Sequence, residues 1–142
     1  MVEPRKRLLL VDDDESVLFV LCEALHELGT AYEIAATQSG LEALDQVRKA
    51  PCDLLVTDLI MPDLDGIQLT EYVRAHSPQT VVVWITAYGC DRVSEEVARL
   101  GVSCCVDKPL ELHEILQVIR KALATLKDGA QDETRVIAKR LE

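Results

Sequence analysis

Five short, largely apolar runs constrain the fold of this chain more than any other feature of its sequence. The clearest is residues 80–86, Thr-Val-Val-Val-Trp-Ile-Thr, and the others are residues 8–11, 32–37, 53–58 and 103–106. Short apolar runs bounded by turn signals predict buried strands. Strands that stay apolar, without alternating polar residues, belong to sheets that are covered on both faces.

Segments with apolar residues at helical spacing separate these runs. In residues 17–28, for example, Leu18, Leu21 and Leu25 fall on one face of a helix. The same spacing predicts further helices over residues 39–50, 67–76, 90–100 and 110–126. Strands that alternate with helices through right-handed crossovers form an α/β fold, here a doubly wound parallel sheet of five strands with five helices.

The composition limits the partners that such a domain can bind. The 142 residues suit a single domain, and 49% of them are apolar, which is enough for a core. Asp and Glu number 25 against 15 Lys and Arg, so the net charge is −10. This charge disfavours direct contact with nucleic acid or an anionic membrane, and it suits a cationic partner or an acidic cluster that binds a cation.

The five cysteines show no spacing typical of a disulfide framework, and no pair has the Cys-x-x-Cys spacing of a zinc site. Four lie within apolar segments, where a free cysteine behaves as a small hydrophobic residue. We therefore expect free thiols and a reducing compartment. We find no signal peptide and no apolar run long enough to cross a membrane, and we expect a cytoplasmic location.

Asp58 ends one predicted strand and begins a turn. An apolar run precedes it, and Met61-Pro62 and Asp65-Gly66 then force the chain to change direction. In an open α/β sheet, the carboxyl end of a strand faces the ligand crevice. Asp58 is therefore a candidate metal ligand or nucleophile, although an aspartate that only caps a helix or stabilises a turn fits the same position.

Further polar residues stand at the carboxyl ends of other strands. Asp12 and Asp13 follow the first strand, Thr86 ends the fourth and Lys108 follows the fifth. If the first and third strands are neighbours, Asp12, Asp13 and Asp58 converge, and their repulsion favours a Mg²⁺ ion, which prefers oxygen ligands. Together with a lysine and a hydroxyl, these acids fit phosphoryl transfer to an aspartate nucleophile.

This set resembles the receiver domain of bacterial two-component response regulators. The resemblance covers roughly residues 6–126 and rests on four motifs in the right order with the right spacing. These are residues 10–14 (Leu-Val-Asp-Asp-Asp), 57–66 (Thr-Asp, then Met-Pro and Asp-Gly), 85–87 (Ile-Thr-Ala) and 107–109 (Asp-Lys-Pro). It implies a flavodoxin-like sheet with strand order 2-1-3-4-5, a receiver domain over residues 5–127, and a tail or linker over residues 128–142.

The resemblance implies a role for each acid of the site. Asp58 accepts a phosphoryl group from a histidine kinase or a phosphotransfer protein in a Mg²⁺-dependent reaction. Asp13, Asp58 and the backbone carbonyl of Ile60 hold the metal, and Asp12 helps directly or through water. Such a domain is not an enzyme, apart from promoting its own phosphorylation and dephosphorylation.

Two further residues and one surface complete what the resemblance implies. Lys108 pairs with the phosphoryl group, and Thr86 reorients its hydroxyl toward it and so reports phosphorylation. The surface that relays the signal also allows a homodimer, and consists of residues 90–100, 103–106 and 110–126.

Two positions depart from the family pattern. Receivers usually carry an aromatic residue three positions before the lysine, where this chain has Cys105, and often a Phe after Lys-Pro, where it has Leu110. The chemistry at Asp58 needs neither residue. We expect a smaller rearrangement of the signalling surface, with Tyr88 as the nearest ring that could respond.

Two alternatives stay open at this point. Residues 8–16 also resemble the nucleophile motif of haloacid-dehalogenase phosphatases, with Asp12 as nucleophile and Asp14 as acid–base, but the acidic pair that those enzymes need after the lysine is missing. The other alternative is a receiver-like interaction module that is never phosphorylated. A flavodoxin is disfavoured, because no phosphate-binding loop rich in Gly, Ser or Thr follows the first strand.

The remaining candidates for chemistry have simpler interpretations. His26, His76 and His113 lack ligand partners at metal-site spacing, which indicates surface histidines. Trp84 is expected in the core. Cys104 and Cys105 are neighbours in a strand, so their side chains point to opposite faces and cannot form a redox pair with each other.

Overall fold

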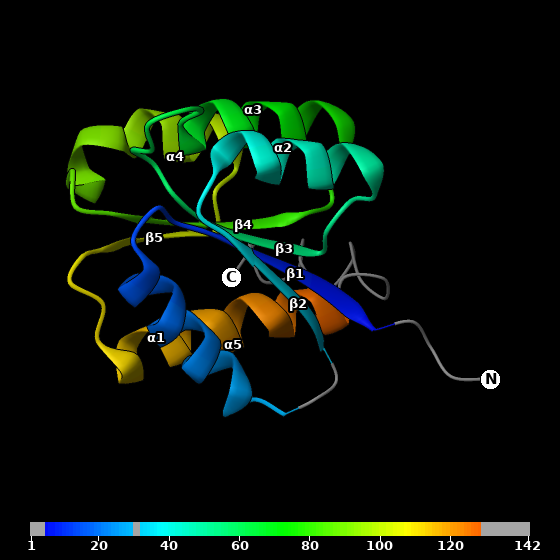
Figure 1. Ribbon diagram of the computed structural model, residues 1–142, viewed down its shortest axis with the longest axis vertical. Coiled ribbons are helices and arrows are strands. Elements are labelled where there is room, and N and C mark those ends of the chain that lie inside the picture. The colour runs from blue at the N-terminus through cyan, green and yellow to red at the C-terminus, as the bar shows by residue number, and fades with distance from the viewer. Residues whose placement is uncertain (1–4, 30–31, 129–142) are drawn as a thin grey trace, which may run out of the picture.

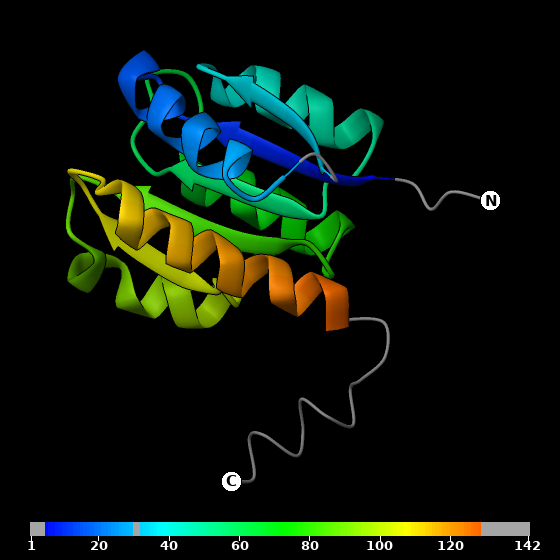
Figure 2. The same ribbon diagram turned by 90° about the horizontal axis from the view of Figure 1, so that it is seen from below.

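The computed structural model describes residues 5–29 and 32–128, which form a sheet between two layers of helices. Helices α1 and α5 cover one face of the sheet, and α2, α3 and α4 cover the other (Figures 1 and 2). The strands are β1 (Lys6–Val11), β2 (Tyr32–Thr37), β3 (Leu54–Asp58), β4 (Val81–Thr86) and β5 (Cys104–Asp107). The helices are α1 (Glu15–His26), α2 (Gly40–Lys49), α3 (Gly66–His76), the 3₁₀ helix η1 (Cys90–Val93), α4 (Ser94–Leu100) and α5 (Leu112–Asp128).

The five strands are parallel and lie in the order β2-β1-β3-β4-β5, as the sequence predicts. The adjacency of β1 and β3 matters most for function, because Val11 stands opposite Thr57. The residues that follow, Asp12 and Asp58, therefore leave the sheet at the same edge. Beside them, Asp58 pairs with Ile85, and Thr86 pairs with Asp107.

Side chains from alternate strand positions build two separate cores. On the α1 and α5 face, Leu8, Leu10 and Val56 pack against helix residues such as Leu21 and Ile119. On the other face, a second cluster includes Leu9, Leu55, Trp84, Leu69 and Leu100. This alternation explains why the central strands β3 and β4 are largely apolar, since both faces of the sheet exclude water there.

Polar side chains define where several helices begin. Asp14 caps α1 by accepting a hydrogen bond from the Ser16 N–H, and Ser39 caps α2 by accepting one from the Glu42 N–H. At α3, Asp65 and Gln68 form a reciprocal capping box. Each cap satisfies a backbone donor that has no partner within the helix.

The predicted elements agree with the observed ones in type and order, although several of their bounds shift. The segment expected as one helix over residues 90–100 begins as the 3₁₀ helix η1, and α4 proper starts at Ser94. The helix predicted from residue 110 starts at Leu112. The tail predicted over residues 128–142 lies outside the described residues apart from its first, and the domain boundary at residue 127 stays a prediction.

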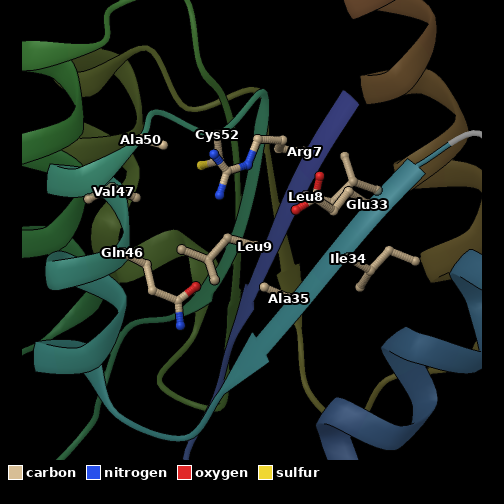
Figure 3. A pocket seen from close by; sticks show the side chains of 10 residues that line it. All are labelled: Arg7, Leu8, Leu9, Glu33, Ile34, Ala35, Gln46, Val47, Ala50 and Cys52. Atoms are coloured by element: carbon tan, nitrogen blue, oxygen red, sulfur yellow. The ribbon is translucent and has the colours of Figure 1, made fainter. Parts of the chain in front are cut away.

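A small cavity lies toward the amino ends of the strands, away from the polar strand ends (Figure 3). It measures about 50 Å³ and is lined by Arg7, Glu33, Gln46 and Cys52 among others. Within residues 5–29 and 32–128, no helix is both long and apolar enough to span a lipid bilayer.

Candidate phosphoacceptor and metal site

Asp12 and Asp58 lie at the carboxyl edge of the sheet and form a buried acidic pair. Asp12 is fully buried and Asp58 is 4% exposed, which is unusual for carboxylates. One oxygen of each is held by backbone: Asp12 Oδ1 accepts the Asp14 N–H at 2.8 Å, and Asp58 Oδ1 accepts the Leu59 N–H at 2.7 Å. The second oxygen of each carboxylate therefore remains available to other partners.

Lys108 provides the positive charge that these acids share. Its Nζ lies 2.8 Å from Asp12 Oδ2 and 3.1 Å from Asp58 Oδ2. Lys108 donates a hydrogen bond to Asp58, and Asp12 Oδ2, which is buried, has its ion pair with Lys108 as its one polar contact among the described residues. One ammonium thus faces two buried carboxylates, and a negative charge remains uncompensated.

Asp13 adds a third carboxylate that faces solvent. One oxygen of each of Asp12, Asp13 and Asp58 falls within a common distance of 4.8 Å. This set fits a hard divalent cation, because it offers only oxygen ligands, keeps one side open to water, and contains three carboxylates against one ammonium. The convergence that the sequence predicts for these acids is therefore present.

Burial alters the titration of Asp12 and Lys108. Desolvation raises the pKa of Asp12 and outweighs the opposing effect of the Lys108 ammonium. Burial disfavours the charged form of Lys108, but the carboxylates of Asp12 and Asp58 outweigh it and raise the pKa of the lysine. The Lys108 side chain therefore stays an ammonium at neutral pH, and burial disfavours the ionised form of Asp12.

Thr86 and Ile60 lie beside the acidic pair. Thr86 is fully buried at the end of β4, and its Oγ1 accepts a hydrogen bond from the Tyr88 N–H at 2.9 Å. The Ile60 N–H points to Asp58 Oδ1 at 3.4 Å, while the Ile60 side chain is 60% exposed. A groove of about 490 Å³ lies next to these two residues and is lined by Ile60, Tyr88 and Arg92 among others.

Gly66 explains why the Asp-Gly motif follows Asp58. The Gly66 N–H donates to the Leu59 carbonyl at 2.9 Å, and a Cβ at this position would collide with the Asp58 carbonyl oxygen. The start of α3 can approach the strand end only because residue 66 lacks a side chain. The glycine therefore fixes the backbone beside Asp58.

Asp63 is a structural residue that the sequence analysis missed. Its carboxylate accepts hydrogen bonds from Ser39 Oγ at 2.5 Å, the Gly40 N–H at 3.1 Å and the Leu41 N–H at 3.3 Å, at the start of α2. The hydrogen bond from Ser39, with those from backbone N–H groups, lowers the pKa of Asp63 to about 2. Only the fold could reveal this role, because the partners lie more than twenty positions earlier in the chain.

The expectation that all five cysteines are free is wrong. Cys90 and Cys105 form a disulfide, with their Cα atoms 5.8 Å apart, whereas Cys22, Cys52 and Cys104 are free. Cys104 and Cys105 do point to opposite faces, since they pack with different cores. The pairing escaped prediction because it depends on where the η1 turn sets Cys90, and not on a spacing motif.

The other sequence interpretations agree with the structure. His26, His76 and His113 are exposed. Trp84 is fully buried in the core, and its indole N–H donates to Thr70 Oγ1 at 2.9 Å. Within the described part of the chain, the one cluster of at least three potential metal-ligating side chains is the Asp12, Asp13 and Asp58 set.

Comparison with known proteins points to one family. The model of the response regulator receiver domain matches residues 8–120. The chain is 34% identical over 117 residues to the transcriptional regulatory protein ZraR of Escherichia coli K12, covering 82% of this chain and 26% of ZraR. It is 35% identical over 134 residues to the response regulator MprA of Mycobacterium avium, covering 93% of this chain and 56% of MprA. It thus spans about a quarter and about half of these two relatives.

Solved structures give the same result for the fold. A CheY-like response regulator receiver domain protein from Methanospirillum hungatei JF-1 superposes with a TM-score of 0.79 at 25% sequence identity. The match covers 89% of this chain and 99% of that one.

Proposed function

The chain belongs to the response regulator receiver family, and from this premise we propose that Asp58 accepts a phosphoryl group from a phosphohistidine of a histidine kinase or phosphotransfer protein. The observation that carries the proposal is the position of Asp58. Its carboxylate is buried at a strand end, shares an ammonium with Asp12, and lies beside an acidic cluster that suits a divalent cation.

Asp13 and Asp58, with the Ile60 carbonyl and Asp12, would hold Mg²⁺ at this site. When bound, the ion supplies positive charge that offsets the crowded carboxylates and the oxygens of an incoming phosphoryl group. The fit rests on the all-oxygen donor set and on the excess of negative charge, since three carboxylates share one ammonium.

The residues of the chain divide the work of transfer. A carboxylate oxygen of Asp58 attacks phosphorus, an O–P bond forms, and the N–P bond to the donor imidazole breaks with its electron pair leaving on nitrogen. Lys108, already 3.1 Å from Asp58 Oδ2, is positioned to pair with the phosphoryl oxygens. Attack of water on phosphorus later returns the free carboxylate and inorganic phosphate.

Thr86 is suited to report the phosphoryl group. Its buried hydroxyl oxygen already accepts the Tyr88 N–H, so rotation toward a phosphoryl oxygen would alter the contacts of the loop after β4. The chain would then act as a switch and not as an enzyme on other substrates, since it promotes only its own phosphorylation and dephosphorylation. A cytoplasmic location and a homodimer through α4, β5 and α5 stay predictions of the sequence.

The phosphatase alternative, with Asp12 as nucleophile, loses its support. The receiver family model covers Asp12 and Asp58 together.

The test is intact-mass spectrometry after incubation with acetyl phosphate, with and without Mg²⁺. Wild type is expected to gain one phosphoryl group only with the metal, and Asp58→Asn is expected to gain none. Asp63→Asn, a change of a carboxylate that caps α2, is the matched control and should be labelled like wild type. Equal labelling of Asp58→Asn would contradict the proposal, and an unlabelled wild type would favour the never-phosphorylated module.

A further inference from the structure

The disulfide joins the two segments that carry Thr86 and Lys108. Cys90 is the first residue of η1, four positions after Thr86, and Cys105 lies on β5, three positions before Lys108. A hydrogen bond between the Cys90 N–H and Asp107 Oδ1, at 2.9 Å, supports the same link. The bond therefore lies beside the phosphoacceptor site without including any of its residues.

The segment between Thr86 and Cys90 is otherwise weakly held. Ala87 and Tyr88 are exposed, and Gly89 has a φ of 106°, a conformation that is favourable only for glycine. The Arg92 guanidinium stacks over the Tyr88 ring at 5.1 Å, so η1 and this loop form one surface. Without the disulfide, residues 87–93 would be attached to β5 mainly by the Cys90–Asp107 hydrogen bond and by Val93 in the core.

Burial disfavours the reactive form of the three free cysteines. Burial raises the pKa of Cys52 to about 11, and burial also raises the pKa of the Cys22 and Cys104 thiols. A thiol reacts as its thiolate, so these three are less reactive. Cys90 and Cys105 are partly exposed to solvent, as Cys22 and Cys104 are, but only Cys90 and Cys105 among the cysteines are placed so that they join each other.

We propose that Cys90 and Cys105 are a reversible redox-modification site that controls residues 87–93. As a disulfide, the pair holds η1 against β5; as two thiols, it releases this segment. The effect on signalling rests on the proposed function: the disulfide limits how far residues 87–93 respond to a phosphoryl group on Asp58, and reduction removes that limit.

A hydroperoxide is the oxidant class that this chemistry suits, and hydrogen peroxide is its simplest member. One thiolate sulfur attacks hydrogen peroxide, an S–O bond forms, and the O–O bond breaks with loss of water after protonation. The second sulfur then displaces the hydroxyl group as a second water, and the S–S bond forms. The two thiols lose two electrons, the peroxide gains them, and a dithiol reductant reverses the change by exchange.

The first test is peptide mapping of the full chain after reduction and then treatment with hydrogen peroxide. We expect a linked pair of peptides that contain Cys90 and Cys105, which dithiothreitol separates. Cys104→Ser should give the same linked pair, and Cys90→Ser should not. Failure of wild type to form this link, or preferential linkage through Cys22, Cys52 or Cys104, would overturn the proposal.

The second test is hydrogen exchange of oxidised and reduced wild type, with and without beryllofluoride and Mg²⁺ as the probe. Reduced protein should exchange about tenfold faster over residues 87–93, as expected for a released segment, and should gain more protection from the probe. Cys90→Ser should behave as reduced protein under both conditions, and Cys104→Ser should follow wild type.

The results separate the two proposals. Identical exchange of oxidised and reduced protein over residues 87–93, with and without the probe, would overturn the redox site. A redox difference without any effect of beryllofluoride would support the site, overturn its link to signalling, and count against the proposed function. Equal protection by the probe in both redox forms would overturn the link alone.

Discussion

Two cross-links hold β5 and the residue that follows it, and they differ in kind. Lys108, just after the strand, is an ionic link to Asp12 on the β1 side and Asp58 on the β3 side. Cys105, within the strand, is a covalent link to Cys90 in η1. The ionic link joins two buried carboxylates at the centre of the sheet edge, whereas the covalent link joins two partly exposed cysteines on the β5 side.

The difference shows how each link can be broken. The ionic link depends on protonation, on cations and on any phosphoryl group that competes for the ammonium. The covalent link depends on redox conditions and is indifferent to phosphate. A domain that carries both can therefore receive two chemically independent inputs at neighbouring points of one sheet edge.

Loss of the ionic link should have the largest effect on stability. Lys108→Met leaves two buried carboxylates without a cation, which typically costs about 3–5 kcal/mol. We expect a loss of this size in the free energy of unfolding in urea without divalent metal. Lys49→Met is the control: its ion pair with Asp45 is exposed, and its removal should cost less than about 1 kcal/mol. Equal losses of stability in Lys108→Met and Lys49→Met would show that Asp12 and Asp58 are not both charged in the folded protein.

Reduction of the covalent link should have a somewhat smaller effect. The disulfide closes a loop with a sequence separation of 15, for which chain entropy gives about 3 kcal/mol. We expect dithiothreitol to lower the free energy of unfolding of wild type by roughly this amount, and to leave Cys90→Ser unchanged. Cys22→Ser should lose stability on reduction as wild type does. If dithiothreitol left the stability of wild type unchanged, the disulfide would not be a stabilising link.

Removal of Asp13, the acid that faces solvent, should reveal how strongly the three carboxylates repel one another. Asp13→Asn removes one of three crowded carboxylates, and since Asp13 is exposed, we expect a gain of only about 0.5 kcal/mol in stability in EDTA. The same variant should gain less stability from Mg²⁺ than wild type does. Thermal unfolding with and without Mg²⁺ measures both effects. Lower stability of Asp13→Asn in EDTA would mean that the three acids do not repel one another.

The smallest expected effect is the pH dependence of the contribution that Asp63 makes to stability. The pKa values of Asp12 and Asp63, two acids at this edge of the sheet, move in opposite directions. Burial raises that of Asp12, whereas hydrogen bonds lower that of Asp63 to about 2. A carboxyl with a lowered folded-state pKa stabilises the fold above its unfolded value, near 3.8, and loses this contribution as the pH falls toward 2. The stability difference between wild type and Asp63→Asn should therefore shrink from pH 5 to pH 2, as followed by urea unfolding. A difference that is constant with pH would contradict the role of the Asp63 charge.

The sequence predicts the ionic link well, for a physical reason. Asp12, Asp58 and Lys108 each follow an apolar strand, and parallel strands bring their carboxyl ends to one edge, so adjacency in space follows from strand order. The predicted places of Trp84 and the three histidines follow equally from periodicity and exposure. These inferences need only local patterns and one topology.

The same reasoning could not predict the covalent link or the Asp63 cap. Cys90 meets Cys105 only because η1 turns the chain at a point where helical spacing predicts a regular helix. Asp63 reaches the start of α2 from a loop that is far away in sequence. Arg74 likewise donates to the carbonyls of Leu100 and Thr80, which no local pattern connects to it. Contacts of this kind depend on loop geometry and not on periodicity.

The central claim, that Asp58 is the residue that accepts a phosphoryl group, is tested most directly by locating the modification. Protein incubated with acetyl phosphate and Mg²⁺ is treated with borohydride, which reduces an aspartyl phosphate to homoserine, and the peptides are sequenced by tandem mass spectrometry. We predict homoserine at position 58 and aspartate retained at positions 12, 13 and 63. Homoserine at position 12, or at any of these positions in place of 58, would contradict the account.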